Sequence, residues 1–204
     1  MPGDPQITVP LSDPRLARIP IRDSGEPLVD VRASAPLRVA GLTYLRYGLV
    51  DRLVTAQSLL PRDVRLLIVD GYRPPALPCR HLTCALEEAR LVRPAVSTED
   101  MRHLVGLCAT PPPVAPHPTG GAVDLTLSEV DDGVVLLPAC CTGPVPPPTE
   151  RTGELLASAL VAVGLVNYPA RWWHWSYGDR FWACVNQAPH ARYGPLPTAP
   201  SATL

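Results

Sequence analysis

Hydrophobic residues recur at helical spacing in two long stretches of the chain. From Gly41 to Leu60, leucines repeat every three or four positions, and Pro61 ends the pattern. This spacing predicts a helix over 41–60. In the second stretch, 150–164, the leucine and valine side chains fall on one side of a helix, and Gly164 stands near the expected C-terminal cap. Residues 76–93 and 98–109 are predicted as two further helices.

Shorter apolar runs predict strands. They cover 65–70, 122–127, 165–168, 171–177 and 181–185. Helices and strands mix without a regular strand–helix–strand alternation. The sequence therefore predicts a fold of the α+β class.

The chain divides into an N-terminal arm, a domain and a tail. With 204 residues it is long enough for one domain with a real core. We expect the domain at 41–190, preceded by an extended arm over 1–40 that carries one or two short strands and packs on it. Residues 191–204 are a proline-rich tail. Proline is unusually common, at 27 residues, and the segment 138–148 is so rich in it that we expect a loop there.

Composition excludes several classes of protein. The formal net charge is −1, and every basic residue is arginine. Without a basic stripe for a phosphate backbone, binding to nucleic acid is not expected. No apolar run is long enough to span a membrane. The N-terminus has no secretory leader pattern and the six cysteines form no CxxC motif, so we expect a cytoplasmic protein with reduced thiols.

Two histidines and an aspartate form the strongest candidate for chemistry. His117 and Asp124 are separated by a segment with two glycines, which allows a tight turn between them, and His174 lies in an aromatic stretch. Two neutral imidazoles and one carboxylate suit a catalytic zinc ion, with one position left for water or substrate. The alternative is that each histidine is an ordinary core or surface residue.

Three segments resemble the zinc D,D-peptidases, in particular the VanX-type D-alanyl-D-alanine dipeptidases. They read Val-Asp-Gly-Tyr-Arg-Pro over 69–74, His-x-x-Gly-x-Ala-x-Asp over 117–124, and Trp-Trp-His over 172–174. The resemblance extends from about residue 41 to 183. It implies a small antiparallel sheet with flanking helices, the Hedgehog-type fold of that family.

The resemblance also implies roles for individual residues. His117, Asp124 and His174 would bind zinc, and Arg73 would stabilise negative charge on the tetrahedral intermediate. A fixed guanidinium suits that task, because amide addition places negative charge on an oxygen. Tyr72 would lie with it in the substrate pocket. The expected substrate is a small molecule or short peptide, and the oligomeric state stays open.

This sequence departs from the family at the position of the catalytic glutamate. The family carries Glu two residues before the second Trp, whereas this chain has Arg171. An arginine cannot accept a proton near neutral pH. Ala115 also replaces a family serine, and the segment 136–148 replaces a pocket-lining segment. Together these changes are typical of a repurposed site.

No other residue is singled out by the sequence as a substitute base. Acidic residues follow the 122–127 strand and open the 150–164 helix, but a solvated surface charge is the simpler interpretation of each. His103, His190 and the pair Cys140 and Cys141 are further alternatives. The tryptophans Trp172 and Trp173 either belong to the core or form a pocket wall beside His174.

Three hypotheses follow. The first is a D-alanyl-D-alanine dipeptidase or amidohydrolase with a substitute base. The second is a zinc enzyme of altered reaction, such as a tailoring step in specialised metabolism, in which Arg171 holds a substrate carboxylate or stabilises an enolate or oxyanion. The third is a catalytically silent binding protein. We rank the second hypothesis slightly above the first, because a complete set of three metal ligands is hard to explain unless the protein uses the metal.

Overall fold

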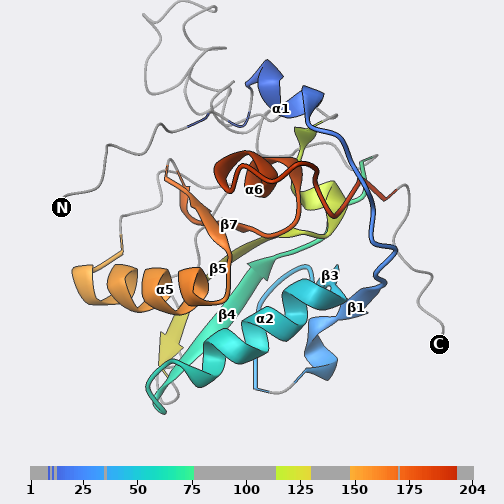
Figure 1. Cartoon of the computed structure of the whole chain (residues 1–204). Helices are drawn as coiled ribbons and strands as arrows, with labels where there is room; N and C mark the ends of the chain where they lie inside the picture. Colours follow the sequence, from blue (N-terminus) through green and yellow to red (C-terminus); the bar gives the residue numbers. More distant parts are fainter. Residues whose placement is uncertain are drawn as a thin grey trace, which may run out of the picture.

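Five strands of the part of the chain that the structure describes form one sheet, with the order β2-β4-β5-β7-β6 (Figure 1). A computed structural model gives the structure, which is described at Val9, Leu11 and residues 13–34, 36–75, 114–129, 148–169 and 171–196. The strands are β2 (Arg38–Val39), β4 (Val64–Asp70), β5 (Ala122–Glu129), β6 (Val166–Tyr168) and β7 (Arg171–Ser176). Neighbouring strands are antiparallel, except that β2 runs parallel to β4. The α+β class is confirmed.

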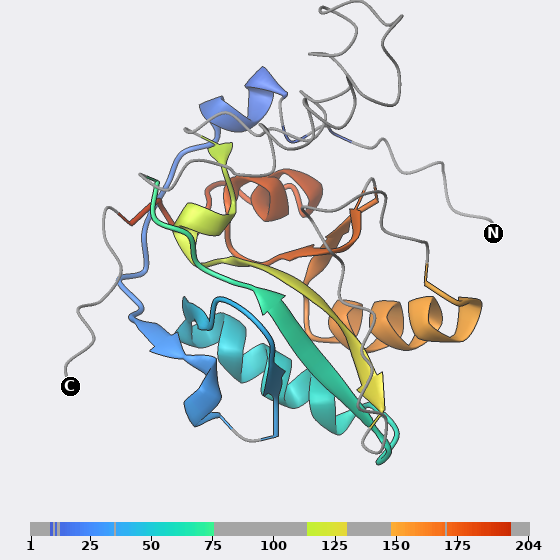
Figure 2. The same cartoon turned by 180° about the vertical axis from the view of Figure 1, so that it is seen from behind.

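Two helices cover one face of this sheet (Figures 1 and 2). They are α2 (Tyr47–Ser58) and α5 (Glu150–Ala162). Leucines of both helices pack with apolar residues of β4 and β5 in the main hydrophobic core. The face of β4 and β5 that carries these apolar residues is buried, which fixes the register of the central strands.

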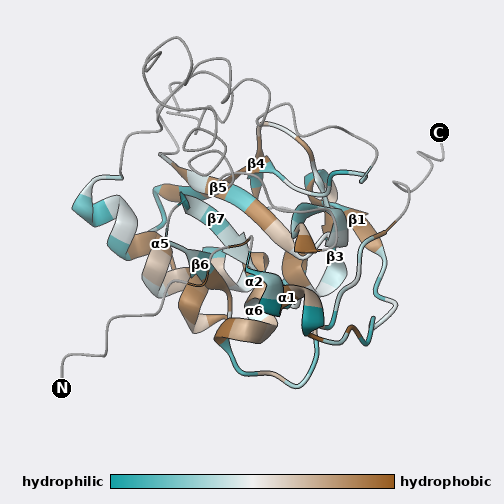
Figure 3. Ribbon diagram, turned by 90° about the horizontal axis from the view of Figure 1, so that it is seen from above, coloured by the Kyte–Doolittle hydropathy of each residue, from teal (hydrophilic) through white to brown (hydrophobic). Residues whose placement is uncertain are grey.

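The ends of α5 follow from its sequence. Thr149 caps the N-terminus, where its hydroxyl accepts a hydrogen bond from the Thr152 N–H at 3.2 Å. The helix passes from hydrophilic residues at that end to hydrophobic ones at its C-terminal end (Figure 3). Gly164 follows with φ of +83°, a conformation that favours glycine. The prediction of a helix over 150–164 is therefore correct to within two residues.

The helix predicted over 41–60 begins later than the leucine pattern indicates. Tyr44–Arg46 form the strand β3, which pairs antiparallel with β1 (Leu28–Asp30), and α2 starts only at Tyr47. Leu45 is fully buried from the strand, while Leu42 is exposed. Pairing with the N-terminal segment overrides the local helical spacing here.

The strand predicted over 181–185 is wrong, because these residues belong to the short helix α6 (Arg180–Val185). Asp179 explains the difference, since its carboxylate accepts a hydrogen bond from the Trp182 N–H at 2.8 Å and so caps a helix. With α1 (Pro14–Arg18), α6 encloses a second, smaller core that contains Leu16 and Phe181.

The guanidinium of Arg46 ties the N-terminal segment to the rest of the molecule. This side chain is 2% exposed and donates to the Thr119 carbonyl oxygen at 2.9 Å and to Asp23 Oδ2 at 2.7 Å. It also reaches the carbonyl oxygens of Glu26 and Gly194. The segments at 23–26, 119 and 194 are thus held around one buried cation.

The two helices predicted over 76–93 and 98–109 lie outside the described residues, as does the predicted loop apart from Pro148. A short 3-10 helix, η1 (Val31–Ala33), connects β1 with the rest of the N-terminal segment. No helix among the described residues is long and apolar enough to cross a membrane.

Candidate metal centre

His117 is positioned by a tight loop before β5. It opens the 3-10 helix η3 (His117–Thr119), which ends at Gly120 with φ of +69°. The His117 Nδ1 atom lies 2.7 Å from the Gly71 carbonyl oxygen, at the end of β4. Since a carbonyl can only accept, Nδ1 carries the hydrogen and the lone pair of the neutral ring stands on Nε2.

Asp124 lies in the middle of the site, on the central strand β5. It is the register partner of His174 on β7 and of Asp70 on β4. Side chains at directly opposite positions of antiparallel strands share one face of the sheet. Asp124 Oδ1 is 2.7 Å from His174 Nδ1 and 3.4 Å from His117 Nε2.

These three side chains form a group that could hold a metal ion. One potential ligand atom from each lies within 4.8 Å of the others. His117, Asp124 and His174 are 6%, 3% and 1% exposed. The His117 Nε2 and His174 Nε2 atoms are buried without a hydrogen-bond partner. Buried polar atoms are normally satisfied, so an unpartnered imidazole nitrogen beside a carboxylate fits a metal ligand.

The electrostatics of the group favour an anionic Asp124 and a neutral His174. Burial alone would raise the pKa of Asp124, but His117 and His174 outweigh it and hold that pKa well below its usual value. Burial lowers the pKa of His174 to about 4, against the opposing influence of Asp124. Metal ligands must be deprotonated, and these are the protonation states that a divalent cation requires.

A bulge in β7 shapes the approach to His174. On β6, Asn167 and Tyr168 are adjacent, whereas their partners on β7 are Trp175 and Arg171. Three residues of β7, Trp172–His174, therefore lie opposite the single peptide bond between Asn167 and Tyr168. Because the bulge interrupts the usual alternation of side chains, Arg171 shares the face of His174 rather than that of Trp175.

Arg171 is accordingly close enough to act on the centre through its charge. Its side chain is half-buried, and its positive charge is one of the smaller causes that lower the pKa of His174. Trp172 and Trp173 are also half-buried, and their rings meet edge to face with centroids 5.7 Å apart. Trp172 packs against the main core.

Arg73 and Tyr72 follow β4 and border the His117 loop. The Arg73 backbone N–H donates to the His117 carbonyl oxygen at 3.4 Å, and Arg73 Nε is 2.9 Å from Asp70 Oδ2. Tyr72 is buried, and its hydroxyl donates to the Leu196 carbonyl oxygen at 2.9 Å. The guanidinium is thus held by a carboxylate next to the metal group, while the Tyr72 hydroxyl is engaged by the C-terminal segment.

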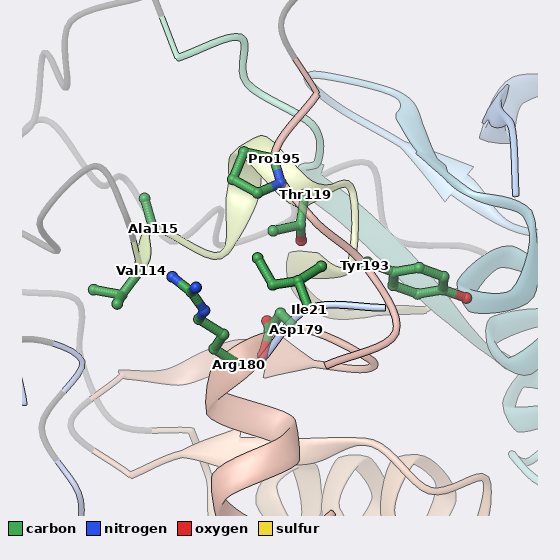
Figure 4. A pocket seen from close by; sticks show the side chains of 8 residues that line it. All are labelled: Ile21, Val114, Ala115, Thr119, Asp179, Arg180, Tyr193 and Pro195. Atoms are coloured by element: carbon green, nitrogen blue, oxygen red, sulfur yellow. The ribbon is translucent and has the colours of Figure 1, made fainter. Parts of the chain in front are cut away.

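Ala115 lies on the other side of the His117 loop, where it lines a small cavity (Figure 4). Thr119, Asp179 and Arg180 are among the other lining residues. Burial raises the pKa of Asp179 to about 6, against hydrogen bonds that lower it. Tyr72, Trp172 and Trp173 do not line this cavity, so the four residues expected in a substrate pocket are not gathered around it.

Sequence reasoning missed three residues of the site. Asp70, which pairs with Arg73, lies in the 69–74 motif, but the motif assigned it no role. Asp179 could have been found as a helix cap, because aspartate is a preferred residue at the position before a helix. Asn167, which contacts the β7 bulge, gave no signal in the sequence at all.

No protein-family model matches the sequence. Among curated proteins, the chain is similar to a D-alanyl-D-alanine dipeptidase of Synechocystis sp.. The alignment is 218 positions long and shows 27% identity, and it covers 81% of this chain and 87% of the relative. This likeness agrees with the α+β fold described above.

Proposed function

We propose that the chain is a zinc-dependent enzyme on a D,D-dipeptidase scaffold, with His117, Asp124 and His174 as the metal ligands. The observation that carries this proposal is the buried group of three ligand-type side chains with unpartnered imidazole nitrogens. Two imidazoles and one carboxylate leave a position for a small molecule or short peptide. When bound, zinc would supply Lewis-acid polarisation of a substrate carbonyl.

In this proposal Arg73 stabilises the negative charge that develops on the substrate's carbonyl oxygen. Its ion pair with Asp70 supports the role, because a guanidinium that is already oriented loses little freedom when it binds an anion. The hydrogen bond from the Arg73 backbone to His117 keeps this segment beside the metal group.

Arg171 determines which type of reaction we propose. An arginine at the position of the family's glutamate cannot take a proton from water, and general-base catalysis typically contributes about 10²–10⁴-fold in rate. The exchange also makes the local charge more positive, and that charge acts on His174. We therefore assign Arg171 to a substrate carboxylate, or to an enolate or oxyanion formed from the carbonyl group, in a reaction other than ordinary dipeptide hydrolysis.

The second candidate is D-alanyl-D-alanine dipeptidase activity with a substitute base. The likeness to the Synechocystis dipeptidase favours it. Asp70 and Asp179 are buried carboxylates of the described part of the chain and are the candidates for this base. Asp70 is the better placed by register, since it lies directly opposite Asp124.

Alanine release from D-Ala-D-Ala separates the two candidates. The assay compares the zinc-loaded wild type with Arg171→Glu, and uses Arg171→Gln as a control that removes the positive charge without adding a carboxylate. We expect cleavage by Arg171→Glu only. Cleavage by the wild type would instead support the second candidate.

A protein that binds zinc but cleaves D-Ala-D-Ala in neither form would direct the search to other carbonyl substrates. Binding of a small carboxylate such as acetate to the zinc-loaded protein then tests Arg171 directly. Affinity should fall in Arg171→Gln. Equal affinity in the two proteins would contradict the role of Arg171, and retained ligand binding after loss of His117 would indicate a silent binding protein.

A further inference from the structure

The bulge of β7 leaves two backbone carbonyl groups outside the ladder with β6. Regular pairing between β6 and β7 is interrupted between Tyr168↔Arg171 and Asn167↔Trp175. The peptide groups of Trp172 and His174 lie within this interruption. Since unpaired backbone polar groups are costly in the interior, these carbonyl oxygens need donors from elsewhere.

A single side chain supplies a donor to both. Asn167 Nδ2 lies 3.0 Å from the Trp172 carbonyl oxygen and 3.0 Å from the His174 carbonyl oxygen. An amide nitrogen has two hydrogens, so both are used. The Trp175 indole adds a second hydrogen bond to the Trp172 carbonyl at 3.1 Å. Asn167 therefore bridges the two ends of the bulged segment that carries His174.

We propose that Asn167 is a positioning residue of the metal centre, whose carboxamide holds the β7 bulge so that His174 and Arg171 face Asp124 together. This inference rests on the proposed function, because it takes His174 as a metal ligand. Asn167 lies on the edge strand β6 and does not belong to the metal group itself. Its effect passes through the backbone of His174.

The chemistry of the contact predicts that other side chains cannot replace asparagine here. Aspartate has the same shape but only acceptor oxygens, which would face two carbonyl oxygens. Serine retains one donor on a shorter side chain. The backbone of the bulge should therefore shift strongly in Asn167→Asp and less in Asn167→Ser. This shift should move His174 away from Asp124.

The test measures metal binding rather than turnover. Metal-free wild type, Asn167→Asp and Asn167→Ser are titrated with Zn²⁺ and with Co²⁺, well below their melting temperatures, and the visible absorption of the Co²⁺ form is recorded. We expect affinity to fall about 10–100-fold in Asn167→Asp, as is typical when a residue behind a metal ligand is lost. Asn167→Ser should lie between it and the wild type. The Co²⁺ bands should shift in both.

Asn186 provides a matched control. Its Nδ2 atom also donates to one backbone carbonyl, that of Trp182 at 2.9 Å, but it lies at the end of α6. Asn186→Asp should leave metal affinity and the Co²⁺ spectrum unchanged. Wild-type affinity and spectrum in folded Asn167→Ser would overturn the inference alone, even if Asn167→Asp does not fold. Failure of the wild type to bind metal would overturn the proposed function as well.

Discussion

His117 and Gly71 are joined by a hydrogen bond of 2.7 Å from the imidazole Nδ1 to the backbone carbonyl oxygen. Gly71 immediately follows β4, and His117 opens the loop before β5, so the contact links two motifs that lie far apart in the sequence. It fixes the tautomer of His117 and aims its Nε2 lone pair toward Asp124. A ligand held in this way loses less freedom when it binds a metal.

The loop that carries His117 depends on glycine at position 120. A Cβ atom there would collide with the Leu28 side chain and come within 3.3 Å of Arg46 Cγ, in a backbone conformation that disfavours alanine. Gly120→Ala should lower the free energy of unfolding by roughly 2–4 kcal/mol, of which about 1–2 is backbone strain. Urea unfolding measures this loss.

Gly164→Ala is the matched control for that prediction. Gly164 also has positive φ, but a Cβ atom there meets nothing within 4 Å. It should therefore cost only the backbone strain of about 1–2 kcal/mol and leave zinc affinity unchanged. Equal losses of stability in the two variants would show that the packing around Gly120 does not matter.

The buried carboxyl group of Asp179 should make stability depend on pH. Its pKa is raised to about 6 from an unfolded value of 3.8, so the folded state binds the proton more tightly. The contribution of Asp179 to the free energy of unfolding is fully present below pH 3.8 and is lost as the pH rises to about 6. Asp179→Asn removes this dependence. As the pH rises from 3.8 to about 6, the free energy of unfolding of the variant should increase relative to that of the wild type by up to about 3 kcal/mol.

The comparison is made on metal-free protein, by urea unfolding at several pH values. His174 acts in the opposite direction, because its pKa is lowered to about 4 and its contribution is lost as pH falls from 6.5. It is present in both proteins, so it cancels in the difference. A difference between wild type and Asp179→Asn that does not change from pH 4 to pH 6 would contradict a raised pKa of Asp179.

Removal of the Arg73 guanidinium should impair turnover without loss of metal. Arg73→Ala should lower kcat about 10²–10³-fold in whichever protein, wild type or Arg171→Glu, turns over substrate, as is typical for loss of one oxyanion donor. Zinc affinity should stay the same, since Arg73 is not a ligand. Arg65→Ala is the control, because within the described part of the chain the Arg65 guanidinium donates to the nearby backbone carbonyl groups of Arg62 and Val64. Full activity of Arg73→Ala would refute the role of Arg73.

Much of the fold could be predicted from the sequence where a pattern was both long and local. The α5 helix has its own cap and apolar side, and the apolar runs of β4 and β5 are bounded by glycine and proline. The segment at 44–46 could not be predicted, because pairing with residues 28–30 decides its structure. The helix α6 was mistaken for a strand because six residues are too few to show helical spacing.

The candidate site shows the same division. His117, Asp124 and His174 are recognisable from residue type and motif, and the structure brings them together. The residues around these three side chains cannot be recognised in the same way. The ion pair of Asp70 with Arg73, for example, depends on the turn after β4. The contact of Asn167 depends on a register shift between two strands. Such a shift leaves no trace in hydrophobic periodicity.

Equilibrium dialysis of metal-free protein against zinc tests whether His117, Asp124 and His174 bind one metal ion. We predict about one zinc ion per chain in the wild type. Alanine at any of the three positions should weaken binding by at least about 100-fold, more than is usual for a residue behind a ligand. His190→Ala, which changes a histidine outside the group, should bind as the wild type does. Zinc binding that survives the loss of any one of these three side chains, or that is lost equally in His190→Ala, would contradict this metal site.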